Sequence, residues 1–510
     1  MRGLALAAIA LAVLIVAARY GSYVAGGSDS YCYVHQSERW AAVLRHPFAA
    51  RLQEIEPLAL DAPWPRAPAA FAPTGHIPSP TVRGAAVPMC PAGVSIAMAL
   101  FRLIGAPAAV FAVVPVCGVV LVLATAVTGG RYGARIGLAA ALLVASSPAF
   151  LYQLVQPMSD VPAAALWMLA VACATGTSPR RVAWAGAASS GAILVRPNLV
   201  PLALVIGAFL LFRPERSWRQ RVRATLTYAA WCLPGCLAVA SIQWTLYGSP
   251  LSSGYGPNEV LFRAERVPTN LTRYVRWLSD MYTPLVALAA LAPLLLPGAL
   301  TLLCVGLVLV NVALYLPYLV FDDWTYLRFL LPTIPLLLVL VVAVVDAVLR
   351  RSRVTRTTPL LAVMSIVLAT VFVRHARDGS TFRLQQMEAR FERAGRYVGE
   401  RLPANAIVVT LWESGSVRHY GHRNTLVWDQ LDPEWLDRAL QYLRSRGWRP
   451  YLLFEGAEEG NFRARFAAAS EVGAVDWPPV AEIQSRVRLY DPDDRRRYLA
   501  GERISTEYVR

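Results

Sequence analysis

Residues 329–356 read FLLPTIPLLLVLVVAVVDAVLRRSRVTR, an apolar run that ends in a cluster of arginines. A second apolar run, residues 357–373, follows at once. Apolar runs of roughly 20 residues are long enough to cross a hydrocarbon core as helices. Because arginines concentrate in cytoplasmic loops, this stretch predicts two membrane-spanning helices that are joined on the cytoplasmic side.

The composition of the whole chain is that of a membrane protein. Of its 510 residues, 56% are hydrophobic and 16% are charged, and the mean hydropathy is +0.43. After about residue 375 the long apolar runs give way to short ones and denser charge. We therefore predict a membrane domain over residues 1–375 and a water-soluble domain over residues 376–510.

The net charge of +16 would indicate nucleic-acid binding in a soluble protein. Here every basic residue is Arg, as a high-GC coding bias produces, and the arginines gather in loops between apolar runs. The charge is therefore explained by membrane topology. Membrane lipids are the expected partners, and nucleic acid is not.

Four arginine-rich loops predict the topology: residues 131–135, 180–181, 213–223 and 350–356, all expected in the cytoplasm. Between them we count about 11 transmembrane helices. The expected spans are residues 3–19, 107–128, 136–151, 161–175, two short helices on either side of Arg196, and residues 224–246, 284–297, 299–320, 329–349 and 357–373.

Two assignments at the N-terminal end follow from this count. Residues 3–19 could be a signal peptide, but the many later spans favour an uncleaved helix with a cytoplasmic N-terminus. A first outer loop then covers about residues 20–86. The run at about residues 87–104 is expected to be an interfacial helix on the outer leaflet, because a full crossing there would place Arg131 outside. The C-terminal domain then lies outside the membrane.

The cysteines leave one alternative open. Cys232 and Cys236 share a helix face in an apolar run, but no His or second Cys pair accompanies them, so we reject a metal site there. Cys32 and Cys90 fall in the region expected outside the membrane. A disulfide between these two residues is compatible with that compartment.

Acidic residues follow two membrane boundaries on the outer side. Asp29 comes after Gly26-Gly27, and Asp160 lies in Met158-Ser-Asp-Val-Pro162. Each precedes a predicted helix, so a helix-capping role is the alternative reading. Two acids at one membrane face suggest a paired acidic site for proton transfer. A metal would need more ligands than these two, and a divalent cation is left open.

Two arginines are expected at the same face. Arg196 lies in the outer turn of a short hairpin, and Arg328 lies where an outer loop enters a helix. Arginines at a membrane boundary can simply extend toward lipid headgroups. Beside carboxylates, however, they suit an anionic lipid whose headgroup reacts.

The C-terminal segment is predicted to be a small α/β domain with a mostly parallel sheet. Its expected strands are residues 406–410, 425–428, 450–454 and 486–490, and its expected helices are residues 383–401, 433–446 and 460–469. No nucleotide-binding fingerprint is present. An accessory role is expected for this domain.

Several short motifs follow one another along the chain. They are Gly26-Gly-Ser-Asp-Ser-Tyr31, Ser147-Pro148, Met158-Ser-Asp-Val-Pro162, Leu194-Val-Arg-Pro-Asn198, Tyr247-Gly-Ser-Pro-Leu-Ser-Ser-Gly-Tyr-Gly256, Arg328-Phe-Leu-Leu-Pro332, Leu402-Pro-Ala-Asn-Ala-Ile-Val-Val409 and Ser414-Gly-Ser416. Together these motifs resemble the GT-C superfamily of membrane glycosyltransferases, in the bacterial branch related to protein O-mannosyltransferases and aminoarabinose transferases. The resemblance covers nearly the whole chain through the order of its motifs.

The resemblance implies inverting sugar transfer from a polyprenyl-phosphate donor to an acceptor on the outer face of the bacterial cytoplasmic membrane. Asp29 would be the general base and Asp160 would orient the acceptor or a metal. Arg328 and Arg196 would stabilise the leaving phosphate, and Tyr255 would shape the pocket. Gln36, in the first outer loop, is a further candidate for substrate binding. The family often has a second acid where this chain has Ser30, which leaves metal dependence open.

The acceptor is expected to be a glycan, lipid or protein of the cell envelope. One alternative function is a transporter or flippase of lipid-linked saccharides. Such proteins place charges near the membrane midplane and often contain repeats, whereas this chain has no visible repeat and its charges cluster at one face. A membrane-tethered binding module is a third alternative, and it leaves the many spans unexplained.

Overall fold

The computed structural model describes residues 2–47, 49–214, 217–352 and 356–509, so parts of the arginine-rich loops 213–223 and 350–356 lie outside the described residues. The chain forms two compact units. We call residues 1–21, 91–242 and 256–384 the helical unit, and residues 22–90, 243–255 and 385–510 the α/β unit. The first loop therefore groups with the C-terminal segment, which the predicted boundary at residue 375 did not anticipate.

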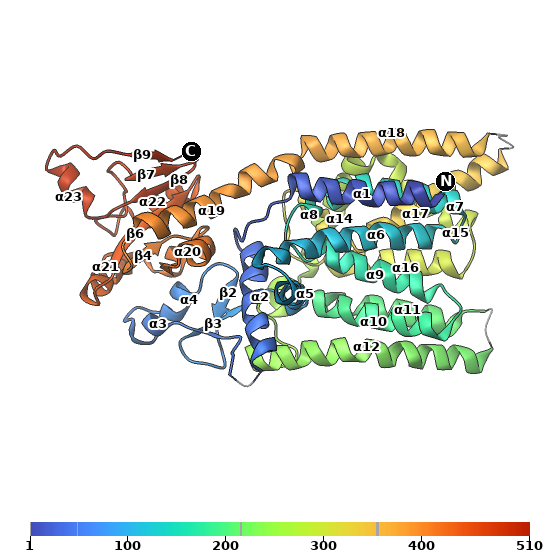
Figure 1. Cartoon of the computed structure of the whole chain (residues 1–510), viewed down its shortest axis with the longest axis horizontal. Coiled ribbons are helices and arrows are strands. Elements are labelled where there is room, and N and C mark those ends of the chain that lie inside the picture. The colour runs from blue at the N-terminus through green and yellow to red at the C-terminus, as the bar shows by residue number, and fades with distance from the viewer. Residues whose placement is uncertain (1, 48, 215–216, 353–355, 510) are drawn as a thin grey trace. The chain divides into compact units, whose positions relative to one another are not determined.

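Long helices that run side by side dominate the helical unit (Figure 1). Its helices are α1 (Arg2–Tyr20), α5 (Ala92–Ile104), α6 (Val113–Gly129), α7 (Ala134–Ser146), α8 (Pro148–Leu154), α9 (Asp160–Ala174), α10 (Pro179–Val195), α11 (Pro201–Phe212), α12 (Trp218–Tyr247), α13 (Asn258–Leu261), α14 (Val267–Tyr282), α15 (Ala292–Leu295), α16 (Ala299–Tyr315), α17 (Ile334–Arg351) and α18 (Thr357–Asp378). Shorter 3-10 turns include η1 (Pro107–Ala112), η2 (Pro197–Leu199), η4 (Pro284–Leu291), η5 (Trp324–Leu330) and η6 (Thr381–Arg383).

Length and apolarity identify four described helices that can each cross a membrane: residues 2–20, 107–129, 218–247 and 357–378. Three bent helix pairs raise this number to seven if each pair is one span. The expected count of about 11 is therefore not confirmed and stays a prediction. The expected interfacial helix at residues 87–104 begins only at Ala92, because residues 85–88 form a strand.

The bend between α7 and α8 determines where the next loop lies. Pro148 starts α8, and the Ser147 hydroxyl accepts a hydrogen bond from the Phe150 amide, which ends α7 and restarts the helix at 58° to it. Proline is favoured at the first position of a helix and disfavoured inside one. The Ser147 hydroxyl also contacts the hydroxyl of Tyr282 at 2.6 Å. This buried contact connects the bend to the end of α14.

Glycines allow the helices of this unit to approach closely. A Cβ on Gly235 of α12 would lie 2.2 Å from the carbonyl oxygen of Ser190 on α10, and one on Gly129 would lie 3.0 Å from the Cα of Gly137. Small residues at helix contacts are typical of membrane proteins, in which packing replaces the hydrophobic effect between helices. Any larger side chain at Gly235 would push α10 and α12 apart.

Two arginines of the arginine-rich loops contact residues that lie beside another of these loops. Arg135 forms an ion pair with buried Asp346 at 2.7 Å and donates hydrogen bonds to Thr357 and Thr358. Arg213 donates to the carbonyl oxygen of Gly176, just before α10. Loops that the sequence assigned to one side are thus neighbours in both cases. Asp160 and Arg196 lie at the opposite ends of α9 and α10 from the Arg213–Gly176 contact, and Arg328 lies in η5, before α17.

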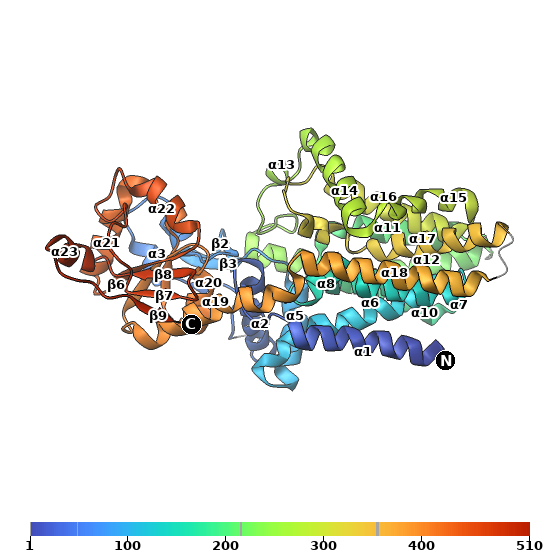
Figure 2. The ribbon, with the colours of Figure 1, turned by 90° about the horizontal axis from the view of Figure 1, so that it is seen from above.

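The α/β unit contains a six-stranded sheet whose order is β5-β4-β6-β8-β7-β9 and which is covered by helices on both faces (Figure 2). The strands are β4 (Ala406–Val409), β5 (Asn424–Leu426), β6 (Arg449–Glu455), β7 (Ala481–Ile483), β8 (Val487–Tyr490) and β9 (Glu507–Val509). The helices include α19 (Leu384–Arg401), α20 (Ser414–Gly421), α21 (Leu436–Ser445), α22 (Glu458–Phe466) and α23 (Asp494–Leu499).

The sheet is parallel only in part. Strands β5, β4 and β6 run parallel, as expected, but β8 pairs antiparallel with both β6 and β7, and β7 pairs parallel with β9. The strands β7 and β9, three residues each, were not predicted.

The first loop supplies part of the hydrophobic core of this unit. It forms α2 (Asp29–Arg45), α3 (Pro57–Asp61), α4 (Ala67–Phe71) and a small sheet of β1 (Glu54–Ile55), β3 (Ala85–Pro88) and β2 (His76–Pro78). Trp64 and Phe71 are buried in one cluster with side chains of α21 and α22. The amide of Val427 donates to the carbonyl oxygen of Ala70. The C-terminal domain is therefore built from two distant parts of the chain.

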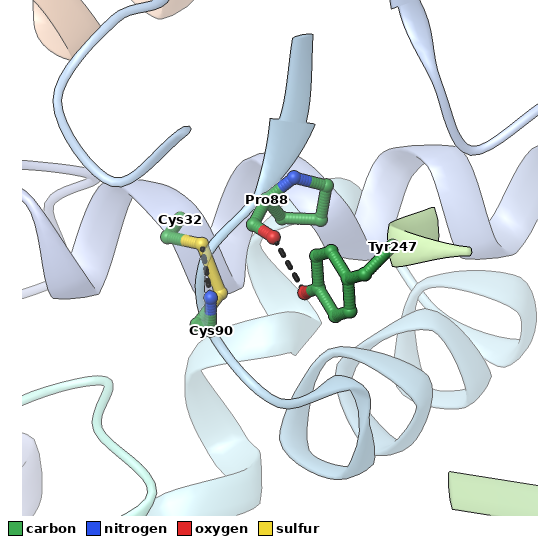
Figure 3. Close-up of a disulfide and its surroundings, with 4 residues drawn as sticks. All are labelled: Cys32, Pro88, Cys90 and Tyr247. Carbon is green, nitrogen blue, oxygen red and sulfur yellow. Dashed lines mark hydrogen bonds between the residues drawn. A yellow bond between two sulfur atoms is a disulfide. The ribbon is translucent and has the colours of Figure 1, made fainter. Parts of the chain in front are cut away.

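A disulfide joins Cys32 of α2 to Cys90, which follows β3, and their Cα atoms lie 6.3 Å apart (Figure 3). Beside it the Tyr247 hydroxyl donates to the carbonyl oxygen of Pro88 at 2.8 Å. These contacts fasten the end of the loop to α2 and to the end of α12. The disulfide that the sequence left open is thus present in the structure.

Replacing Cys90 by Ser should lower the free energy of unfolding by about 3 kcal/mol, because the loop ends are no longer crosslinked in the unfolded chain. Thermal unfolding of the full-length protein in detergent measures this change. Dithiothreitol should destabilise the wild type and leave the Cys90→Ser variant unaffected. Alkylation of both Cys32 and Cys90 in the native, unreduced protein would contradict the crosslink.

Glu458, at the start of α22, is buried beside the ends of β4 and β6. It accepts hydrogen bonds from the Leu411 amide at 2.6 Å and from the Trp428 indole at 2.8 Å. Burial nevertheless raises its pKa to about 7. The folded state therefore holds a proton on this carboxyl at a pH where the unfolded chain has lost it.

Since this pKa is higher in the folded state, the stabilisation is complete below about pH 4.5 and is lost as the pH rises through 7. The difference corresponds to about 3 kcal/mol. Unfolding measured at pH 5.5 and pH 8 should show a smaller loss of stability in Glu458→Gln than in the wild type. An unchanged pH dependence in this variant would exclude Glu458 as the titrating group.

Candidate active site

Asp160 and Arg196 form a buried ion pair in the helical unit. The Arg196 Nη2 donates to Asp160 Oδ1 at 2.5 Å, and its Nε donates to the Ser159 hydroxyl at 3.2 Å. Asp160 is fully buried and Arg196 is 8% exposed. Arg196 reaches this position because Pro197 disfavours a helical conformation at residue 196, which ends α10 there.

The pair is placed where its charges are best tolerated. Asp160 is the first residue of α9, where the helix dipole favours a negative charge. Its Oδ2 is buried and has no hydrogen-bond partner among the described residues. Both predicted residues therefore come together, and the capping residue is Ser159 rather than Asp160. A carboxylate that has one oxygen on Arg196 positions that guanidinium.

Arg328 belongs to the same cluster through the ring of Phe329. The Arg328 Cζ lies 5.3 Å from the centroid of this ring, and the Arg196 Cζ lies 5.9 Å from it. A guanidinium at this distance from a ring is attracted to its π electrons. The two cations thus share one aromatic side chain.

Further aromatic residues hold Phe329 in place. Tyr315 stacks on Phe329 with centroids 4.8 Å apart, and the Asn198 amide donates to the Tyr315 hydroxyl at 2.8 Å. Asn198 follows Arg196 closely in the sequence. One short turn therefore supplies both the guanidinium and a hydrogen bond to the tyrosine that stacks on Phe329. The roles of Phe329 and Tyr315 were missed by sequence reasoning, because neither residue type nor spacing distinguishes them from other apolar positions.

Arg196 and Arg328 thus place two guanidinium groups beside one ring. Arginine binds phosphate oxygens through paired N–H donors in a fixed geometry. Guanidinium groups gathered in this way are of the kind that binds a phosphate. The role of Arg196 and Arg328 in stabilising an anion stays a prediction.

The other predicted residues belong to the α/β unit. Asp29 is the first residue of α2, and Ser28 occupies the capping position without a side-chain capping bond. The capping role considered for Asp29 is thus wrong. Gly27 precedes Ser28 with a positive φ of 58°, which a glycine adopts without strain. The Gly-Gly turn therefore delivers Asp29, half-buried, to the start of the helix.

Gln36 and Tyr255 differ in their surroundings. Gln36 is 2% exposed, and neither polar atom of its side chain has a hydrogen-bond partner among the described residues. It lines a cavity of about 10 Å³ with His35, Arg39, Glu54 and His76, which is room for about one water molecule. Tyr255 is 38% exposed. The substrate-binding role of both residues stays a prediction.

Replacing Asp160 by Asn should destabilise the protein by about 3–5 kcal/mol, because Arg196 would remain buried without a counter-charge. The double variant Asp160→Asn/Arg196→Gln should recover part of this loss. A double-mutant cycle on thermal unfolding in detergent measures the coupling between the two residues.

The matched control for this experiment is the exposed ion pair of Arg276 and Asp280, whose side chains are 78% and 53% exposed. Asp280→Asn should change stability by less than about 1 kcal/mol, because water screens such a pair. If Asp160→Asn were no less stable than Asp280→Asn, the buried pair would not support the fold.

No protein-family model matches the chain, and no curated protein matches it in sequence. Solved structures do match its fold. The oligosaccharyltransferase of Archaeoglobus fulgidus, tethered to an acceptor peptide with the NVT sequon, has a TM-score of 0.59 at 12% identity, over 94% of this chain and 72% of that chain. ArnT from Cupriavidus metallidurans, bound to undecaprenyl phosphate, has a TM-score of 0.52 at 11% identity, over 90% and 94%.

A third similar structure is the arabinofuranosyltransferase AftD from Mycobacteria, with a TM-score of 0.51 at 16% identity. That match covers 88% of this chain but only 36% of AftD. All three proteins are GT-C glycosyltransferases, and this chain has their fold.

Proposed function

We propose that the protein is a membrane glycosyltransferase that moves a sugar from a polyprenyl-phosphate donor to an acceptor on the outer face of the bacterial cytoplasmic membrane. The observation that carries this proposal is the cluster of Asp160, Arg196 and Arg328 around Phe329, in which the Asp160–Arg196 pair is buried. The GT-C fold of the chain supports it. ArnT, one of the proteins with this fold, was solved with undecaprenyl phosphate, which is the kind of lipid phosphate that such a cluster would bind.

The orientation rests on two further observations. Structural disulfides form in oxidising compartments and are rare in the cytoplasm, so the Cys32–Cys90 bond favours an extracytoplasmic α/β unit. The arginine-rich loops that include Arg135 and Arg213 favour a cytoplasmic position for the other ends of the helices. The cluster around Phe329 would then lie at the outer side of the membrane, with the N-terminus in the cytoplasm.

In the proposed reaction Asp29 is the general base. Its carboxylate takes the proton from an acceptor hydroxyl while the hydroxyl oxygen attacks the anomeric carbon. The bond from that carbon to the phosphate oxygen breaks in the same step, so the carbon is inverted through a transition state with oxocarbenium character. The electron pair of the broken bond remains on the lipid phosphate.

The guanidinium groups of Arg196 and Arg328 stabilise the leaving group. Charge develops on the phosphate oxygen as the bond breaks, and fixed guanidiniums in a dry site stabilise such charge strongly. Arg328 and Arg196 perform this role, and Asp160 acts on the reaction by positioning Arg196. Gln36 and Tyr255 complete the binding of donor and acceptor. The acceptor is a cell-envelope glycan, lipid or protein.

Asp29→Asn should reduce transfer by about 10²–10⁴-fold, because an amide cannot take up the proton. The assay measures transfer of radiolabelled sugar from polyprenyl-phosphate donors in membranes that contain equal amounts of each variant. Asp61→Asn is the control, since Asp61 is an exposed acid in the same loop, and it should keep wild-type activity. Equal transfer by Asp29→Asn would remove this residue from catalysis.

Arg328→Gln should reduce the rate by about 10²–10³-fold, the usual cost of removing one group that stabilises developing charge. Arg276→Gln, which alters an exposed arginine, should have little effect. If the wild type transferred no sugar from any donor but moved lipid-linked saccharide between leaflets of a vesicle, the protein would be a flippase instead.

A further inference from the structure

Two helices of the α/β unit face each other with residues that can bind a metal. Tyr31, His35 and Glu38 lie on one face of α2, spaced by four and three residues. Gly415 and His419 lie on one face of α20. A Cβ on Gly415 would lie 2.4 Å from the Tyr31 ring, so only glycine permits this contact. The close approach brings the imidazole of His419 near the side chains of His35 and Glu38 on α2.

The side chains of His35, Glu38 and His419 each offer one ligand atom, and these atoms lie within 4.8 Å of one another. His35 Nδ1 is 3.9 Å from the Glu38 carboxylate. All three side chains are partly buried, so an ion can enter from solvent. Small movements of these side chains would bring the three atoms to the separations that a tetrahedral ion requires.

Glu54 prepares His35 for this role. Its carboxylate accepts a hydrogen bond from the His35 Nε2 at 3.0 Å and a second from Arg39 at 2.7 Å. A proton on Nε2 leaves the lone pair on Nδ1, the atom that faces Glu38. This Nδ1 is buried and has no hydrogen-bond partner among the described residues. A carboxylate behind a metal-binding histidine is the usual way in which such a tautomer is held.

The arginines near the site are paired with carboxylates. Arg39 pairs with Glu54 at 2.7 Å, and Arg418 pairs with Glu56. The nearby arginines are thus matched by carboxylates, which limits their repulsion of a cation.

We propose that His35, Glu38 and His419 bind one Zn²⁺ ion, with water as a fourth ligand, and that the ion joins α2 to α20. Two imidazoles and one carboxylate are typical ligands of zinc, whereas magnesium and calcium prefer oxygen alone. None of these three residues has a role in the proposed transfer reaction. The ion would crosslink the helix that begins at Asp29 to the C-terminal segment.

The test uses the full-length protein in detergent, purified without a histidine tag. The protein is stripped with EDTA, equilibrated with ZnCl₂ and desalted, and its zinc content is measured by mass spectrometry. We expect about one zinc per chain in the wild type, in line with a single site, and almost none in His35→Gln or His419→Gln. His422→Asn is the control, because His422 is exposed and has a positive φ of 49° that asparagine tolerates.

Thermal unfolding gives a second readout that does not depend on activity. Zinc should raise the unfolding temperature of the wild type and of His422→Asn, because it binds only the folded state, and should leave that of His419→Gln unchanged. Glu54→Gln should weaken zinc binding by about 10–100-fold in competition with a chelator. A wild type without zinc, or a His419→Gln variant that binds zinc as tightly as the wild type, would overturn the proposal. The unfolding temperatures without zinc verify that each variant is folded.

Discussion

The buried ion pair between Asp160 and Arg196 is the interaction on which the candidate site depends. A guanidinium that is 8% exposed needs a counter-charge, and the first residue of α9 supplies one where the helix dipole already favours it. The bend at Ser147–Pro148 and the chain reversal at Pro197 both lie close to this pair in the sequence. Two breaks in the helices of this unit thus lie near Asp160 and Arg196 in the sequence.

The ring of Phe329 links this ion pair to a second cation, Arg328. Phe329 contacts both guanidiniums. Tyr315 stacks on this ring, and Asn198 donates a hydrogen bond to the Tyr315 hydroxyl. A ring attracts cations without neutralising them. The two guanidinium groups beside Phe329 are donors of the kind that binds phosphate oxygens.

Much of this architecture could be predicted because apolar runs and arginine clusters are local signals. They located the long helices, and alternating apolar segments located β4, β5, β6 and β8. The residues Asp160, Arg196 and Arg328 were identified from their places beside apolar runs. Their meeting at Phe329 could not be predicted, because a contact between segments more than a hundred residues apart leaves no local pattern. The pairing of α3 and α4 with α21 and α22 was missed for the same reason, and β7 and β9 were not predicted.

The split composition of the α/β unit has a consequence for how the protein is made. Residues 22–90 contribute Trp64 and Phe71 to the core, but the strands they cover are synthesised only after residues 91–384. The first loop is therefore incomplete while the helices between these segments are synthesised. The Cys32–Cys90 bond can form during this interval, since both cysteines precede the helices. It would keep the waiting loop compact and spare its exposed aromatic surface from aggregation until the last strands arrive.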